Sequence, residues 1–143
     1  MNGVNMEMLL IDDNSAETQV ITEIFEENRN VTVTSFKNSG EALKYLHKEG
    51  EYENSKTPSL ILLDLNTHKK NQEILEEIKT DDVLKCIPLI ILTNFMQDKD
   101  IFECYDHHVN AYVIKRANFD EFIEDIHIFK DFWWNSAMLP NCK

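Results

Sequence analysis

The sequence predicts one α/β domain built on a doubly wound, five-stranded parallel sheet. Three observations lead to this fold class: short apolar segments recur five times along the 143 residues, amphipathic helical patterns separate them, and polar residues directly follow several of them. Strands that alternate with helices are typical of parallel sheets covered by helices on both faces. A chain of this length forms one domain of ordinary size.

The predicted strands are short runs of apolar or β-branched residues. The most apolar run, 59–63, lies between Pro58 and Asp64, as expected of a strand buried on both faces. The run at 31–36 alternates and is β-branched, which predicts a strand with one less buried face. In chain order, the five predicted strands are 8–11, 31–36, 59–63, 88–92 and 111–114.

The predicted helices begin at recognisable capping residues. Asn14 or Ser15 can cap the first helix, Asn38 precedes the second, and Asn118 with Glu121 forms a capping box before the last. A further helix passes through 101–105. Apolar residues at helical spacing predict the inward faces of the others: Val20, Ile21, Ile24 and Phe25; Ala42, Leu43 and Leu46; Ile74, Leu75 and Ile78; and Phe119, Phe122, Ile123, Ile126, Phe129 and Trp133.

Composition excludes several classes of partner. The formal net charge of -12 argues against binding to nucleic acid or to an anionic membrane. Neither a membrane span nor a signal peptide is found in the sequence. Cys86, Cys104 and Cys142 are odd in number and widely spaced, which favours reduced thiols. We therefore expect a cytoplasmic protein.

Polar side chains follow four of the predicted strands. Asp12 and Asp13 follow the first, Asp64 the third, Thr93 the fourth and Lys115 the fifth. Right-handed crossovers bring the carboxyl ends of parallel strands to one edge of the sheet, where ligands bind in folds of this class. Clustered carboxylates repel one another unless a cation compensates, and Mg²⁺ is the oxygen-liganded ion that fits.

The chemistry expected of this set is phosphoryl transfer. Asp64 is the candidate nucleophile, Thr93 can donate a hydrogen bond to a phosphoryl oxygen, and Lys115 can form an ion pair with it. Each residue taken alone has a plain structural explanation: a helix start for the Asp pair, strand propensity for Thr93 and surface charge for Lys115. Their shared position directly after apolar strands favours function.

The five positions, with Tyr112 three residues before Lys115, resemble the receiver domains of two-component response regulators. The resemblance covers nearly the whole chain and implies a flavodoxin-like, CheY-like fold with strand order 2-1-3-4-5. The likeness is strongest to the stand-alone response regulators of cyanobacterial phytochromes, in segments 49–52, 62–66, 105–110 and 132–140.

The resemblance implies a role for each site residue. Asp64 accepts a phosphoryl group from a sensor histidine kinase, and Mg²⁺ is bound by Asp13, Asp64 and the backbone carbonyl of Asn66, with Asp12 acting through water. Such a protein is a phosphoacceptor in signalling and not an enzyme with a separate substrate.

The resemblance also implies a switch. Thr93 moves toward the phosphoryl group and Tyr112 turns inward, which reshapes the face of the fourth helix, fifth strand and fifth helix. Two departures bear on loop geometry and phosphoryl lifetime. The loop 67–72 has neither the proline nor the glycine usual after the phosphoacceptor, and Arg116 follows Lys115 where many receivers have a proline.

Two rival functions are weighed against this one. The segment 64–67 superficially resembles the Asp-x-Asp-x-Thr motif of haloacid-dehalogenase phosphatases, but Asn66 cannot serve as the required second acid. The altered loop after Asp64 instead suggests a pseudo-receiver that binds its partner without phosphorylation.

The expected domain spans 1–143, with a core at about 6–134 and a C-terminal tail at 135–143 that is too short for an output domain. A signal would then leave by contact with a downstream protein that the sequence does not identify. Ile128 and Phe132 lie four apart, opposite the predicted core stripe of the last helix. They suggest a homodimer surface, although single exposed apolar residues are also common without function.

Overall fold

The computed structural model describes residues 5–142. Residues 1–4, which open the segment expected to lack a signal peptide, lie outside the described residues, as does 143. The strands are β1 (Met6–Asp12), β2 (Val31–Phe36), β3 (Leu60–Asp64), β4 (Leu89–Thr93) and β5 (Ala111–Ile114). The helices are α1 (Ser15–Glu26), α2 (Ser39–Leu46), α3 (His68–Thr80), α4 (Asp98–Asp106) and α5 (Phe119–Lys130).

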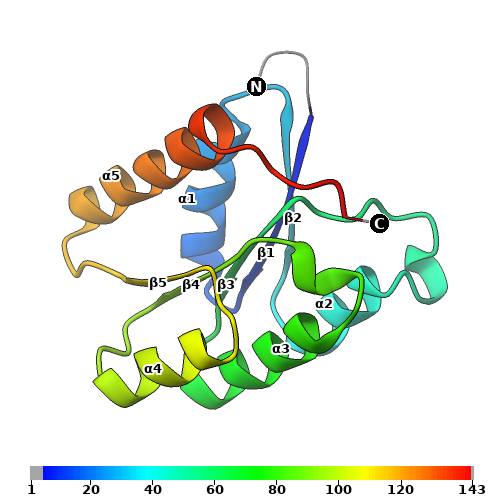
Figure 1. The fold of residues 1–143 in the computed structure, drawn as a ribbon. Coiled ribbons are helices and arrows are strands. Elements are labelled where there is room, and N and C mark those ends of the chain that lie inside the picture. The colour runs from blue at the N-terminus through cyan, green and yellow to red at the C-terminus, as the bar shows by residue number, and fades with distance from the viewer. Residues whose placement is uncertain (1–4, 143) are drawn as a thin grey trace.

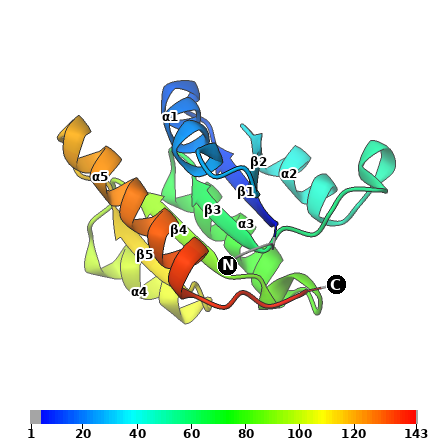
Figure 2. The ribbon, with the colours of Figure 1, turned by 90° about the horizontal axis from the view of Figure 1, so that it is seen from above.

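All five strands are parallel and follow the order β2-β1-β3-β4-β5, which confirms the predicted fold class. Figures 1 and 2 show α1 and α5 on one face of the sheet and α2, α3 and α4 on the other. The register pairs Asp12 at the end of β1 with Asp64 at the end of β3. Two carboxylates are therefore fixed side by side by backbone pairing alone.

Each face of the sheet has its own hydrophobic core. Successive side chains of a strand point to opposite faces, so Leu63 packs toward α3 while Leu62 packs toward α1 and α5. All five residues of β3 and all five of β4 are buried, as expected of central strands covered on both sides. The rigid centre of the sheet thus carries the residues at its carboxyl edge.

The last helix differs from its predicted inward stripe in two places. Phe122 and Ile126 are buried, but Phe119 is 59% exposed, because it lies in the first helical turn, where the groove between α1 and α5 opens. At the other end α5 continues as a π-helical turn, Asp131–Ser136, which holds more residues per turn. This change of phase buries Trp134, while Trp133 is only partly buried against the same core.

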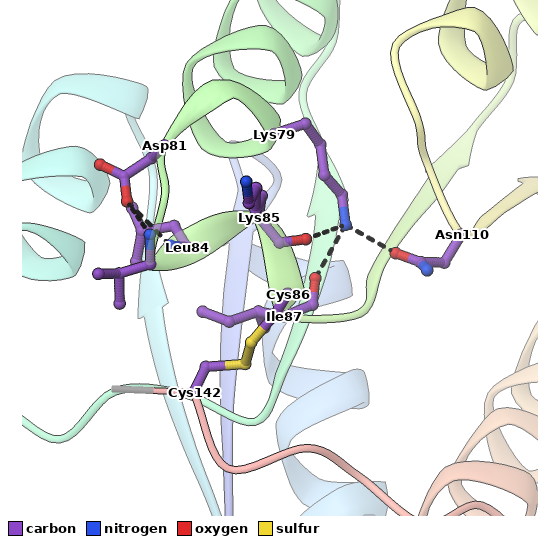
Figure 3. The surroundings of a disulfide bond; sticks show 9 residues. Lys79, Asp81, Leu84, Lys85, Cys86, Ile87, Asn110 and Cys142 are labelled. Atoms are coloured by element: carbon purple, nitrogen blue, oxygen red, sulfur yellow. Dashed lines mark hydrogen bonds between the residues drawn. A yellow bond between two sulfur atoms is a disulfide. The ribbon is translucent and has the colours of Figure 1, made fainter.

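The expectation of reduced cysteines is wrong, because Cys86 and Cys142 form a disulfide with their Cα atoms 6.2 Å apart (Figure 3). The C-terminal tail leaves α5 and returns to the turn Leu84–Cys86, so residues 56 positions apart meet. The spacing of the cysteines in the sequence does not indicate that the C-terminal tail comes back to Cys86. Cys104 is free and buried.

The disulfide removes the argument from cysteines for a cytoplasmic location, since such bonds are rare in the cytosol. Of the helices between residues 5 and 142, none has both the length and the apolar character that crossing a membrane requires.

Candidate functional site

The carboxyl edge of the sheet carries a compact group of charged and polar side chains. Asp12, Asp64 and Thr93 are the last residues of their strands, and all three are buried. Lys115 follows β5, and its backbone N–H donates to the carbonyl of Thr93 at 2.7 Å. This backbone hydrogen bond directs the start of the loop after β5 toward the end of β4.

Lys115 is the centre of an ion-pair network. Its Nζ lies 3.0 Å from Oδ1 and 3.1 Å from Oδ2 of Asp64. It also lies 3.1 Å from each carboxylate oxygen of Glu17, in the first turn of α1. Burial opposes the charge of Lys115, but the charge of Asp64 and these hydrogen bonds leave its pKa raised. One ammonium group thus forms ion pairs with two carboxylates.

Glu17 was not predicted from the sequence as a residue of this site. The signal for it was present, because Glu17 is three residues after Asn14, whose side chain caps α1 by accepting from the Glu17 N–H at 3.0 Å. A glutamate in the first turn of a helix that follows β1 directly has to lie near the carboxyl edge of the sheet.

Burial sets the electrostatics of the two central carboxylates. Burial, with a smaller contribution from the charge of Asp64, raises the pKa of Asp12 to about 7. Burial also raises the pKa of Asp64 to about 7, although the nearby Lys115 acts in the opposite direction. The Oδ1 of Asp12 accepts from the Asn14 N–H at 2.8 Å, whereas Oδ2 is buried without a hydrogen-bond partner.

The acidic group fits a divalent cation. Asp12, Glu17 and Asp64 each offer a carboxylate oxygen, and these three oxygens lie within 4.8 Å of one another. Asp13 lines the adjoining hollow of about 230 Å³ and accepts from the N–H of Asn66 at 3.0 Å. An unpartnered buried oxygen is costly, and several carboxylates around one space form the oxygen-rich ligand set that hard cations take.

The loop after β3 is held by a second residue that the sequence reasoning missed. The Oδ1 of Asn71 accepts from the N–H of Leu65 at 2.9 Å, and Asn71 Nδ2 donates to the carbonyl of Leu65 at 3.2 Å. Asn71 is buried three, four and seven residues before Ile74, Leu75 and Ile78. A polar residue in a core stripe was the available signal.

Thr93 and Tyr112 both contact the loop between β4 and α4. The Thr93 Oγ1 accepts from the N–H of Phe95 at 3.2 Å, and the Tyr112 hydroxyl donates to the carbonyl of Phe95 at 2.8 Å. Burial raises the pKa of Tyr112 to about 12, so the phenol stays neutral at ordinary pH. Both side chains suggested as switch residues are thereby linked to the same short loop.

Ile128 and Phe132 lie away from this group. Their side chains are 56% and 52% exposed, on α5 and on the π-helical turn that follows it. Lys115 precedes the start of α5, whereas Ile128 and Phe132 lie at its far end, so the acidic edge and these two apolar residues are at opposite ends of the helix.

The chain is an α/β domain with a five-stranded parallel sheet and a group of acidic side chains with one lysine at the carboxyl edge of that sheet. The sequence model of the response regulator receiver domain matches residues 8–127. The chain therefore belongs to the response regulator receiver domain family.

Two relatives, Rcp1 and RcpA, show where the chain lies in this family. Response regulator Rcp1 of Synechocystis sp. is 34% identical over 135 residues, which cover 93% of this chain and 92% of Rcp1. The phosphorylated cyanobacterial phytochrome response regulator RcpA superposes with a TM-score of 0.90 at 38% identity, covering 96% and 99% of the two chains. The Mn²⁺-bound structure of Rcp1 gives 0.89 at 33% identity, covering 94% and 99%.

Proposed function

We propose that this protein is a single-domain response regulator whose Asp64 accepts a phosphoryl group from a sensor histidine kinase. The observation that carries this proposal is the position of the Lys115 ammonium, 3.0 Å from the Asp64 carboxylate and paired with the Glu17 carboxylate as well. A lysine so placed can neutralise charge on a phosphoryl group transferred to Asp64. The fold supplies the rigid edge that keeps both groups in position.

Mg²⁺ is the ion we propose for the acidic group. Asp13, Asp64 and the carbonyl of Asn66 would hold it, with Asp12 acting through water. When bound, the ion supplies positive charge to the transferring phosphoryl oxygens. The unpartnered Oδ2 of Asp12 and the carboxylates of Asp12, Glu17 and Asp64 support a divalent ion at this edge.

The transfer itself is a displacement at phosphorus. A carboxylate oxygen of Asp64 attacks the phosphorus of a phosphohistidine, the P–N bond breaks, and the electron pair returns to the imidazole, which then takes a proton. Lys115 now donates to both Asp64 oxygens, so it has to release one of them to the phosphorus. It can then follow the charge to a phosphoryl oxygen.

The transferred group would act on the loop between β4 and α4. Phosphorylation adds roughly -1.5 to -2 charges at Asp64. The Thr93 hydroxyl can donate to the new oxygens, and this movement would disturb the hydrogen bond that Thr93 Oγ1 accepts from the Phe95 N–H. Because the Tyr112 hydroxyl donates to the carbonyl of Phe95, Tyr112 would be affected as well. Converting a mostly inactive population to a mostly active one requires about 5.5 kcal/mol of differential stabilisation.

The likeness to RcpA and Rcp1 supports a phytochrome as the kinase partner. We also propose a cytoplasmic location, where a phosphorylated kinase can reach the acidic edge directly; the Cys86–Cys142 disulfide would then be one of the uncommon disulfides of that compartment. The downstream partner would bind the surface reshaped around α4, β5 and α5.

The test is the mass of the intact protein after incubation with acetyl phosphate and Mg²⁺. We expect one added phosphoryl group in the wild type, and none in Asp64→Asn or in wild type with a chelator. Addition to Asp64→Asn would assign the acceptor elsewhere. A folded wild type that gains nothing from acetyl phosphate or from a phytochrome kinase would overturn the proposal.

A pseudo-receiver is the second candidate. It is favoured by the sharing of Lys115 between Asp64 and Glu17, which stabilises the unphosphorylated arrangement. The same mass experiment separates the two functions, since a pseudo-receiver gains no phosphoryl group from acetyl phosphate or from a kinase. A pseudo-receiver should also bind its partner equally well as wild type and as Asp64→Asn.

A further inference from the structure

A second group of metal-ligating side chains lies between α3 and α4, outside the acidic edge. His68 is the first residue of α3, and Asp100 and Glu103 are three residues apart on one face of α4. The His68 Nε2 lies 3.4 Å from Oδ1 of Asp100 and 3.2 Å from Oε2 of Glu103. One ligand atom from each residue lies within 4.8 Å of the other two.

These separations match the geometry of a four-coordinate ion. Zinc bonds to imidazole nitrogen and carboxylate oxygen are about 2.1 Å long, so neighbouring ligand atoms of a tetrahedral site are about 3.4 Å apart. Both distances from His68 Nε2 are close to this value. An ion could therefore replace the contacts of the imidazole with only small movements of the side chains.

Charge and burial are also suited to a divalent ion. An imidazole that binds a metal ion is neutral, so one imidazole and two carboxylates form a ligand set with two negative charges, which a divalent ion balances. The side chains of His68, Asp100 and Glu103 are 20%, 18% and 31% exposed, so the site is shielded yet open to solvent on one side. Three protein ligands with an open fourth position are the arrangement of many zinc sites.

Neighbouring residues fix the ligands in place. The ring of Phe95 packs edge-on to His68 with ring centroids 6.3 Å apart, and Gln72 hydrogen-bonds to Glu103. Outer partners of this kind orient ligands and raise metal affinity.

We propose that His68, Asp100 and Glu103 bind a divalent transition-metal ion such as Zn²⁺, which links the start of α3 to α4. Mg²⁺ prefers oxygen ligands in octahedral geometry, so this mixed nitrogen and oxygen set selects against it. The acidic edge, whose near carboxylates are Asp12, Glu17 and Asp64, offers oxygen only. The two sites therefore differ in the ion they take.

His47 provides a matched control within the same chain. It too lies beside two carboxylates, but it contacts Glu77 through Nε2 and Asp81 through Nδ1, each at 3.8 Å. The two ring nitrogens point in different directions, so a single ion cannot use both contacts. His47→Gln should leave zinc binding unchanged, whereas His68→Gln and Glu103→Gln should remove it.

The test is calorimetric titration of the full-length, oxidised protein with Zn²⁺ in excess Mg²⁺, which keeps the acidic edge occupied. We expect one zinc ion per chain in wild type and in His47→Gln, and at least about tenfold weaker binding in His68→Gln and Glu103→Gln. Co²⁺ absorption would report a tetrahedral site without thiolate ligands. Circular dichroism checks folding, and Asp100→Asn replaces any variant that fails to fold.

Three results would overturn the proposal: no zinc binding by wild type, equal binding by His68→Gln, or a cobalt spectrum with thiolate bands. Absence of binding would mean that His68 only bridges the two carboxylates as an ion pair. Because none of these measurements uses phosphorylation, their outcome does not depend on whether Asp64 accepts a phosphoryl group.

Discussion

The buried charge of Asp12 lowers the stability of the folded protein. Its carboxylate is buried, one oxygen has no hydrogen-bond partner, and its pKa is raised to about 7. A carboxyl group whose pKa is higher in the folded than in the unfolded state binds more protons when folded. Its charge therefore lowers stability progressively as the pH rises from about 4 to about 7.

Asp12→Asn should consequently stabilise the protein in the absence of divalent ions. We expect the free energy of unfolding to rise by about 1–3 kcal/mol at pH 8, because a charge without full hydrogen bonding is removed. At pH 5 most of this gain should disappear, since the wild-type Asp12 is then protonated. Urea unfolding in a chelator at both pH values measures the difference. An equal or lower stability of Asp12→Asn at pH 8 would contradict this account of the site.

Glu17 should limit the lifetime of a phosphoryl group on Asp64. Its carboxylate competes for Lys115 and repels added negative charge. Glu17→Gln leaves Lys115 to the phosphoryl group, so we expect slower hydrolysis by about threefold to tenfold, or about 1 kcal/mol. Loss of the phosphorylated mass with time gives the rate. Glu23→Gln, on the same helix, serves as control, and unchanged decay in Glu17→Gln would show that Glu17 does not compete.

At the scale of elements, the loop from β3 to α3 depends on one buried amide. Asn71→Ala leaves both the N–H and the carbonyl of Leu65 without their partner. An unsatisfied buried group costs about 1–3 kcal/mol, so we expect the free energy of unfolding to fall by about 2–3 kcal/mol. Phosphorylation should slow as well, because this loop carries Asn66. Urea unfolding checks the stability, with the exposed Lys70→Ala as the control that should stay near wild type.

The predicted homodimer surface lies on α5 and on the π-helical turn that follows it. Ile128 and Phe132 are exposed and apolar, and the ring of Phe132 lies edge-on to Trp133 with centroids 5.0 Å apart. If two copies meet here, Phe132→Asp should weaken association by burying a charge in the interface. Sedimentation velocity over a range of concentrations, with and without phosphorylation, measures this.

Phe119→Asp is the matched control for that experiment. Phe119 is equally exposed but lies at the other end of α5, roughly 15–20 Å away along the helix. It should leave the association constant unchanged. A wild type that stays monomeric at every concentration and phosphorylation state would remove the dimer from consideration.

For the whole molecule, the parts of the fold that follow from local periodicity were predictable. The strands, their alternation with helices and the Asn caps each depend on neighbouring residues, and the parallel sheet follows from them. The meeting of Asp12 with Asp64 follows from topology. Glu17 and Asn71 were missed because each was taken as an ordinary helix residue, although their positions near the strand ends and in the core stripe were readable.

The remaining features depend on contacts between segments distant in sequence. The π-helical turn changes the helical phase and buries Trp134 in place of Trp133, and no residue pattern in the sequence predicts it.

The path of the C-terminal tail likewise cannot be predicted from local sequence. Trp134, Leu139 and Cys142 line a hollow together with Met6 and Pro58, at the edge opposite the acidic group. The tail therefore crosses from the core beside α5 to the core beside α3.

The disulfide that ends this crossing should contribute measurably to stability. Cys86 and Cys142 are 56 residues apart, and a cross-link over such a loop restricts the unfolded chain by about 4 kcal/mol in the chain-entropy model. We expect a reductant to lower the free energy of unfolding by about 2–4 kcal/mol in urea titrations. Cys86→Ser should show the lower stability already and should not respond to reductant, whereas Cys104→Ala, outside the bond, should keep its response. Three reactive thiols in unreduced wild type, together with indifference to reductant, would show that the tail is held by packing alone.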